Sequence, residues 1–169
     1  MARPLYEHTQ AGWPMRIAFM SCAVLFVGMT TLGDLRESPS AQVVLLLGAV
    51  LAVAIGWLWS SLTVRIADDA LRLQFGLGLP RKTVPLADLE SVEVTRTRLL
   101  DGWGVHRTRR GWLYNVSGFD AVLLRRKDGK ALLVGTDEPR KLKAALDRAA
   151  LTLADVDLFA GLPEKVIKH

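Results

Sequence analysis

The stretch AQVVLLLGAVLAVAIGWLWSSL, Ala41–Leu62, decides the fold of this chain because it contains no charged side chain. At about 1.5 Å per residue, a helix of this length reaches about 33 Å, which exceeds the roughly 30 Å hydrocarbon core of a bilayer. We therefore expect Ala41–Leu62 to form a transmembrane helix.

A second apolar stretch, IAFMSCAVLFVGMTTLG, lies before it at Ile17–Gly33. It reaches about 25 Å as a helix, so it spans a bilayer only if its ends lie in the head-group layer or the bilayer thins locally. A cleaved signal peptide is the alternative, since Arg16 precedes the apolar run and small residues follow it at 38–40. The long polar N-terminal region and the short connection at 34–40 favour a tight hairpin of two transmembrane helices.

The charges that flank the two apolar stretches predict the side of the membrane on which the chain ends lie. Arg3 and Arg16 precede the first stretch, and Arg65 and Arg72 follow the second. Because cytoplasmic flanks are enriched in Lys and Arg, we expect a multi-pass protein with both termini in the cytoplasm. Tryptophans suit the same interface. The expected membrane-interface anchors are Trp13, Arg16, Trp57, Trp59 and Arg65.

Small residues recur every four positions in the second stretch, at Gly48, Ala52 and Gly56. They line one face of a helix, where another helix can approach closely. Packing against the first stretch is favoured over a dimer interface, because the hairpin already supplies a neighbouring helix.

The charge of the chain lies mainly behind the apolar stretches. The 169 residues include 22 Lys and Arg against 17 Asp and Glu, and the surplus falls after Leu62. A cationic domain favours contact with anionic lipid, nucleic acid or an acidic protein. The expected organisation is an N-terminal cytoplasmic segment at 1–16, a transmembrane hairpin at 17–62 with helices at 17–33 and 41–62, one compact β domain at 63–150, and a C-terminal tail at 151–169.

Behind Leu62 the hydrophobic period changes to two, which is typical of half-buried strands. Asp68-Asp69 suits the turn of an opening hairpin, and Asp128-Gly129 predicts another because both residues tolerate positive φ. The pattern predicts about seven antiparallel strands, with Leu99–Arg110 as a loop. The expected strands lie at 62–67, 71–75, 81–85, 92–95, 111–116, 121–126 and 130–134. A final amphipathic helix begins near Pro139 and caps the sheet.

Three features of residues 62–151 carry a resemblance to a known family. They are the opening hairpin Leu62–Phe75, the stretch VPLADLESV at Val84–Val92, and Asp128-Gly129 ahead of the final helix. With two apolar helices in front, this region is similar to the pleckstrin-homology-like (PH-like) domains of bacterial membrane proteins. The resemblance implies a mainly-β interaction module at the bacterial plasma (inner) membrane, and it implies no catalytic activity.

The densest group of cations and aromatic residues lies between positions 96 and 114. Arginine offers a planar fork for phosphate oxygens, and Trp and Tyr suit the polar boundary of a bilayer. A solvated loop whose tryptophans close the end of the barrel is the alternative, and the commoner one for a run of charges. The candidate lipid- or partner-binding residues are Arg96, Arg98, Trp103, His106, Arg107, Arg109, Arg110, Trp112 and Tyr114.

No group of residues matches a catalytic or metal-binding pattern. The histidines are scattered, and the single cysteine, Cys22, allows neither an intrachain disulfide nor a cysteine-based zinc site. We expect no cofactor, no metal and no enzyme activity, and nucleic acid is disfavoured by the membrane tether. The expected function is an interaction module for anionic head groups, a protein partner or a second copy of the chain. An accessory subunit of a membrane transporter or envelope enzyme complex is the alternative.

Overall fold

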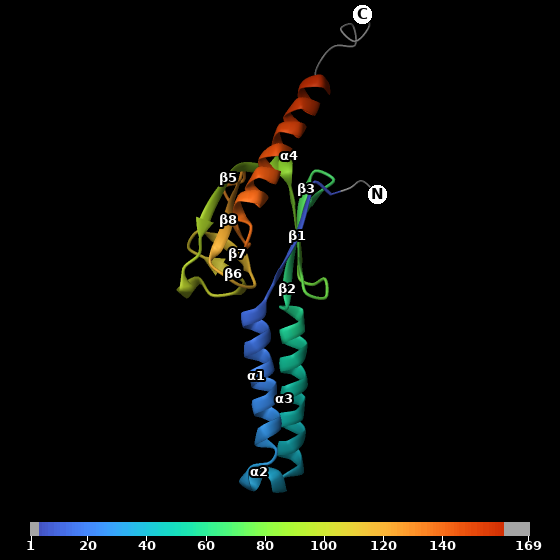
Figure 1. The fold of residues 1–169 in the computed structure, drawn as a ribbon, viewed down its shortest axis with the longest axis vertical. Helices are drawn as coiled ribbons and strands as arrows, with labels where there is room; N and C mark the ends of the chain where they lie inside the picture. Colours follow the sequence, from blue (N-terminus) through green and yellow to red (C-terminus); the bar gives the residue numbers. More distant parts are fainter. Residues whose placement is uncertain (1–3, 161–169) are drawn as a thin grey trace, which may run out of the picture.

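A computed structural model describes residues 4–160, in which an apolar helical hairpin and a β domain are stacked end to end (Figure 1). The chain begins with strand β1 (Tyr6–Ala11) and enters helix α1 (Trp13–Met29). A short helix, α2 (Gly33–Glu37), leads into α3 (Pro39–Leu58), which runs back beside α1 to strand β2 (Ser61–Ala67). The helical hairpin is therefore inserted between two strands of the domain.

The described strands form two sheets, with the orders β1-β2-β3-β4 and β5-β8-β9-β7-β6. Neighbouring strands are antiparallel except for β7 and β9, which are parallel. The remaining elements are β3 (Ala70–Phe75), β4 (Arg81–Pro85), the 3-10 turn η1 (Leu86–Asp88), β5 (Leu89–Arg96), the 3-10 turn η2 (Leu99–Asp101), β6 (Gly104–Thr108), β7 (Gly111–Asn115), β8 (Asp120–Arg126), β9 (Ala131–Gly135) and α4 (Pro139–Ala160).

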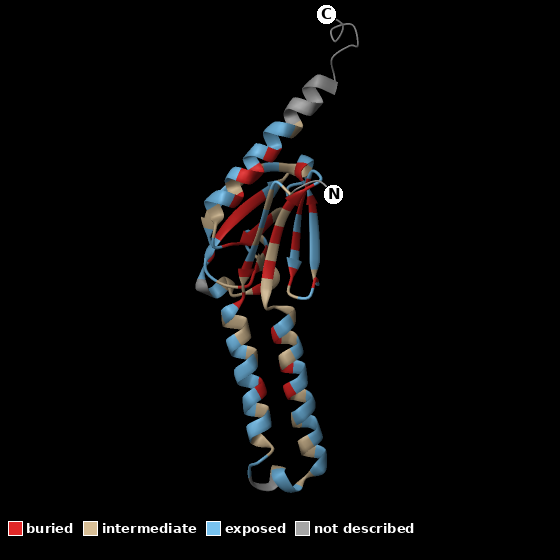
Figure 2. Ribbon diagram, turned by 45° about the vertical axis from the view of Figure 1, so that its right-hand side comes forward, coloured by how far each residue is buried: buried red, intermediate tan, exposed pale blue. Residues whose placement is uncertain are grey.

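The main hydrophobic core lies between the two sheets and α4. Alternate residues of β2 and β3, such as Val64 and Leu73, meet Leu142 and Leu146 of the helix there. This alternation is the period-two pattern of a strand with one buried face. Buried residues concentrate in the β domain, whereas most of α1 and α3 is exposed (Figure 2).

All seven strands expected from the sequence are present, and the structure adds β1 and β6. The hydrophobic pattern gives no signal for β1, because its inward positions are Tyr6, His8 and Gln10 rather than aliphatic residues. The assignment of Leu99–Arg110 to a loop is wrong for β6, whose one aliphatic residue gives no alternation and which is held by pairing with β7. The expectation of purely antiparallel pairing is also wrong, because β7 runs parallel to β9.

The element boundaries shift from those expected. Helix α1 begins at Trp13 rather than at position 17, and α3 ends at Leu58, because Leu62 already belongs to the core of the first sheet. The N-terminal segment is part of the domain through β1. Helix α4 extends through part of the expected tail, of which residues 161–169 lie outside the described residues.

The junction between the hairpin and the domain contains no flexible linker. Strands β1 and β2 pair in continuous register from Tyr6↔Ile66 to Ala11↔Ser61. One residue, Gly12, separates β1 from α1, and its backbone N–H donates to the Ser60 carbonyl at 2.8 Å. The backbones approach so closely that a Cβ at Gly12 would lie 2.6 Å from the Trp59 carbonyl oxygen. Orientation of the domain therefore follows that of the helices.

Helices α1 and α3 pack through small residues. A Cβ at Gly48 would lie 3.4 Å from the Phe26 ring, and one at Gly56 would lie 3.0 Å from the Phe19 Cβ. Ala52 is buried between them in the same contact. The stripe of small residues thus faces α1, where it makes room for two phenylalanines.

One helix among the described residues, α3, is long and apolar enough to cross a membrane. Its most apolar window is 17% buried, which is low for the core helix of a soluble protein. Helix α1 has 17 residues and falls short of that length. Length and composition therefore identify one candidate span rather than the expected pair.

We predict that Gly12→Val lowers the free energy of unfolding by about 1–3 kcal/mol, because its side chain overlaps the Trp59 carbonyl. The matched control is Gly28→Val in α1, where a Cβ meets nothing within 4 Å. Chemical denaturation of the full chain in detergent, followed by circular dichroism, measures both. Equal effects of the two substitutions would contradict a close-packed junction.

Candidate functional site

The cations and aromatic residues singled out from the sequence do not form one cluster. Trp103 lies at the end of the domain next to the helices, and Arg96 and Arg110 clasp the second sheet. Trp112 and Tyr114 line a groove between the sheets. These residues therefore lie in three separate parts of the domain, each with different neighbouring residues.

The loop after β7 brings Trp103 to the helical end of the domain. The Ser117 hydroxyl donates to the carbonyl of Ala11 at 3.0 Å, so this loop lies against the last residue of β1. The Trp103 indole Nε1–H donates to the Gly118 carbonyl at 3.2 Å, and its ring centroid lies 6.5 Å from that of Phe119. An aromatic pair therefore sits beside the start of α1.

The β3–β4 loop presents two leucines at the same end, which the sequence pattern does not single out as a candidate site. The Gly76 N–H donates to the Ser61 carbonyl at 2.9 Å, and Gly76 packs against the last turn of α3 too closely to admit a side chain. Leu77 and Leu79 follow, with 72% and 62% of their surface exposed. An apolar tip is thus fixed next to the end of α3.

Arg110 is a structural clasp rather than a free cation. Its guanidinium donates to the Thr95 hydroxyl at 3.0 Å and to the Arg96 carbonyl at 2.8 Å, and lies 3.7 Å from the Asp101 carboxylate. It therefore joins the β6–β7 turn to the end of β5. Arg96 itself pairs with Asp120 at 3.1 Å.

The other candidate cations stay on the surface. The side chains of Arg98, Arg107 and Arg109 are exposed and form no hydrogen bond or ion pair with a described residue. His106 lies opposite Leu113 in the β6–β7 ladder. Because Arg107 and Arg109 lie on or next to β6, away from the loop that touches Ala11, the structure separates them from Trp103.

A groove of about 410 Å³ opens between β4 of the first sheet and the β7–β9 side of the second. Trp112 is 48% exposed in it. Tyr114 is packed near Phe75, with ring centroids 6.3 Å apart, and burial raises the pKa of its hydroxyl. The groove residues are Lys82, Val84, Trp112, Tyr114, Arg126, Lys130, Ala131 and Leu132.

Internal ion pairs balance much of the charge in this groove. Arg126 lies 2.9 Å from Asp88 and 3.3 Å from Asp128, and Lys130 lies 3.1 Å from Asp128. The backbone N–H of Lys130 lowers the pKa of the Asp128 carboxyl, which stays ionised. Because these cations are paired, the groove offers a partner mainly aromatic and apolar surface rather than positive charge.

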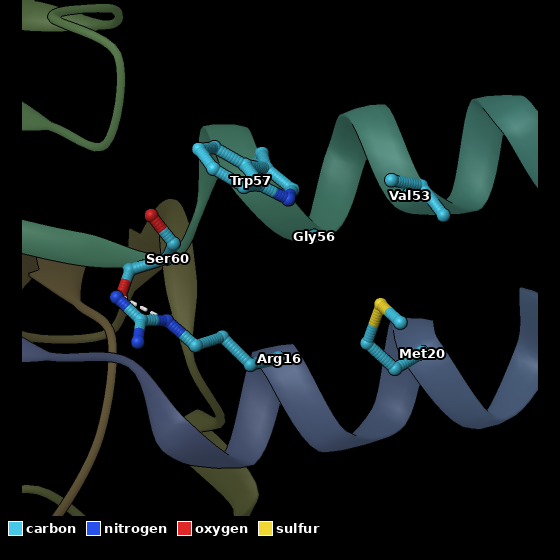
Figure 3. A pocket seen from close by; sticks show the side chains of 6 residues that line it. All are labelled: Arg16, Met20, Val53, Gly56, Trp57 and Ser60. Carbon is cyan, nitrogen blue, oxygen red and sulfur yellow. Dashed lines mark hydrogen bonds between the residues drawn. The ribbon is translucent and has the colours of Figure 1, made fainter.

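A second cavity, of about 240 Å³, lies between α1 and α3 at their domain end (Figure 3). This opening runs along one side of the helix pair, beside the close approach of Gly56 to Phe19. The Arg16 Nε–H donates to the Ser60 carbonyl at 3.1 Å across this opening. The lining residues are Arg16, Met20, Val53, Gly56, Trp57 and Ser60.

The other expected interface anchors have different surroundings. Trp13 and Trp57 are exposed at the helix ends, and the Arg16 guanidinium lies 5.2 Å from the Trp13 ring centroid. Trp59 instead packs edge-on against Phe75, 4.9 Å away, and joins the core of the domain. Arg65 lies further along β2, at 3.8 Å from Glu7 on β1.

A polar cluster ties β1 to the start of α4. The His8 Nε2 lies 2.6 Å from Asp137, and its Nδ1 lies 3.5 Å from Glu138. Burial, together with the negative charge of Glu138, raises the pKa of Tyr6 to about 12. The cluster fixes the first strand against the C-terminal helix.

No protein-family model matches the chain, and no curated protein matches it either. Within residues 4–160, no three His, Cys, Asp or Glu side chains come close enough to hold a metal ion. The function of the chain is therefore inferred from where its charged, aromatic and apolar residues lie in the structure.

We predict that Arg110→Ala lowers the free energy of unfolding by about 1–2 kcal/mol, since it removes charge-assisted hydrogen bonds to Thr95 and Arg96. Arg109→Ala, one position earlier on the exposed turn, is the control and should change it little. Thermal unfolding of both variants measures the difference. A larger loss of stability in Arg109→Ala than in Arg110→Ala would contradict the structural role of Arg110.

We predict that the chain loses stability as the pH rises from about 10 to about 12. The pKa of Tyr6 is about 10 in the unfolded chain and about 12 in the folded chain. Its contribution to the free energy of unfolding is therefore complete below pH 10 and is lost as the pH rises to about 12. Tyr6→Phe should flatten the fall in this window. Urea denaturation at a series of pH values tests it, and an unchanged slope in Tyr6→Phe would contradict it.

Proposed function

We propose that this chain is a non-enzymatic membrane protein in which an apolar helical hairpin holds a PH-like domain against the inner face of the bacterial plasma membrane. The observation that carries the proposal is the junction: β1 and β2 pair directly up to Gly12 and Ser60, with no linker to α1 or α3. A domain fixed in this way cannot leave the membrane surface. Its role is that of an interaction module.

The exposed surface of the hairpin supports a bilayer environment. Large apolar side chains cover the outward faces of both helices, and contiguous apolar surface of this extent is rare on soluble proteins. These side chains are Ile17, Val24, Leu25, Val27, Val43, Val44, Leu46, Leu47, Val50 and Leu51.

The packing of α1 on α3 supports two crossings rather than one. Helix α1 reaches about 26 Å, a few ångströms less than the bilayer core, and snorkelling flanks or local thinning accommodate such a mismatch. Arg16 and Trp13 lie at one end of α1, and α2 with its Arg36 lies at the other. Both termini then lie in the cytoplasm, as the flanking positive charges favour.

Anionic head groups are the partner that the geometry supports best. The apolar tip at Leu77 and Leu79 and the aromatic pair Trp103 and Phe119 flank the helix ends, where an interfacial layer would meet them. Each exposed arginine near an anionic surface, such as Arg98, contributes on the order of 1 kcal/mol. The contact is thus carried by the helical end of the domain rather than by Arg107 to Arg110.

A protein partner is a second candidate, supported by the groove at Trp112. Strand β4 ends its sheet there, and a free strand edge can accept an added strand. The exposed Trp112 ring suits an apolar side chain of such a partner. The lipid contact and the protein contact can coexist. Strand β8 runs from Asp120, at the end of the domain next to the helices, to Arg126 in the groove, and this length is about 20 Å.

Site-specific probes test the proposal in the full chain reconstituted into anionic liposomes. Cys22 is the single cysteine, so Cys22→Ser provides a background for one environment-sensitive fluorophore at a time. We predict that a probe at Val50→Cys is quenched by nitroxides deep in the bilayer, and one at Leu77→Cys by nitroxides near the head groups. A probe at Asp128→Cys, on the distal β8–β9 turn, should be quenched by neither.

The three positions separate the parts of the proposal. A water-exposed probe at Val50 would refute the membrane-spanning hairpin. A deeply inserted Val50 with a water-exposed Leu77 would retain the span and refute contact of the domain with the membrane surface.

A further inference from the structure

The cavity between α1 and α3 combines a cation at one end with an apolar lining. Arg16 stands at its domain end, and Met20 and Val53 point into the space from opposite helices (Figure 3). Gly56 lies on the α3 wall between Val53 and Trp57 and adds no side chain. If the hairpin spans the bilayer, as proposed above, this opening lies where head groups meet acyl chains.

The guanidinium of Arg16 is held in place with part of its donor fork unused. Its Nε–H donates to the Ser60 carbonyl at 3.1 Å, and its carbon lies 5.2 Å from the centroid of the Trp13 ring. Nη1 and Nη2 form no hydrogen bond with a described residue. A cation oriented on two sides in this way is prepared for a bidentate contact with an anionic oxygen pair, such as a phosphate offers.

The rest of the cavity does not suit a small soluble anion. Met20 and Val53 supply an apolar lining further from the domain than the arginine, and the ring of Trp57 lines the cavity at the level of Arg16. A free phosphate would bind the arginine but would leave this apolar surface without a contact. A lipid places its phosphate on the arginine and an acyl chain along Met20 and Val53, so that both parts are satisfied.

We propose that this cavity is a binding site for one anionic phospholipid, whose phosphate is held by Arg16 and whose acyl chain lies along Met20 and Val53, beside the contact of α1 with α3. The site rests on the proposed membrane insertion of the hairpin. It differs from nonspecific contact at the base of the domain, because a single guanidinium fixed to the Ser60 carbonyl defines one position and one stoichiometry. A bound lipid would also contact both helices beside their packing interface.

Native mass spectrometry of the full chain, released from detergent after titration with phosphatidylglycerol, tests the site. We expect one lipid per chain to bind before any others, and phosphatidylcholine to bind more weakly. Arg16→Gln should weaken the first binding step about tenfold or more, because it removes the charged fork. Arg36→Gln, at the opposite end of the hairpin, is the matched charge control and should leave it unchanged.

A second variant keeps the test valid if Arg16→Gln disturbs the junction. Val53→Phe fills the apolar part of the cavity and leaves Arg16 intact, so it too should weaken the first lipid. Equal binding by wild type, Arg16→Gln and Val53→Phe would overturn the site. Displacement of the lipid by inorganic phosphate would assign the arginine to a soluble anion instead.

The membrane probe at Val50 separates the two levels of inference. A deeply inserted Val50 together with lipid binding that ignores both variants would refute the lipid site alone. A water-exposed Val50 would refute the insertion on which the site depends.

Discussion

The pairing of β1 with β2 across the helical hairpin is the interaction on which the rest of the structure depends. It joins residues about fifty positions apart, Ala11 and Ser61, and sets the two helices side by side as they leave the sheet. At its end Gly12 lies against Trp59, and Gly76, which donates to the Ser61 carbonyl, lies against the end of α3. The base of the domain, the apolar tip and the helix ends are therefore one rigid surface.

This arrangement makes the hairpin an insertion within the domain rather than an anchor appended to it. A fragment beginning at Thr63 lacks β1 and the first residues of β2, and so loses the contacts of His8 with Asp137 and Glu138 ahead of α4. Studies of binding therefore require the full chain. The proposed lipid cavity depends on the same junction, because its lining includes Ser60, whose carbonyl accepts from Gly12 and from Arg16.

Period and turn chemistry predict much of the β domain. Aliphatic alternation marks strands such as β2 and β3, and Asp128-Gly129 marks the β8–β9 hairpin. Strands whose inward residues are polar or aromatic, as in β1, carry no such signal and are defined by their partners. The sequence identifies which cations and aromatic residues are candidates for a site, but not where each one lies. Long-range contacts place Trp103 beside the helix ends and Arg110 against β5.

Disulfide trapping of the β1–β2 ladder tests the central claim most directly. The hydroxyls of Thr9 and Thr63 lie 2.8 Å apart on paired strands. In a Cys22→Ser background and native membranes, Thr9→Cys with Thr63→Cys should form a disulfide rapidly on mild oxidation. The control, Thr9→Cys with Thr83→Cys on β4, should not. Equal cross-linking of both pairs, or of neither, would contradict a hairpin inserted between two paired strands.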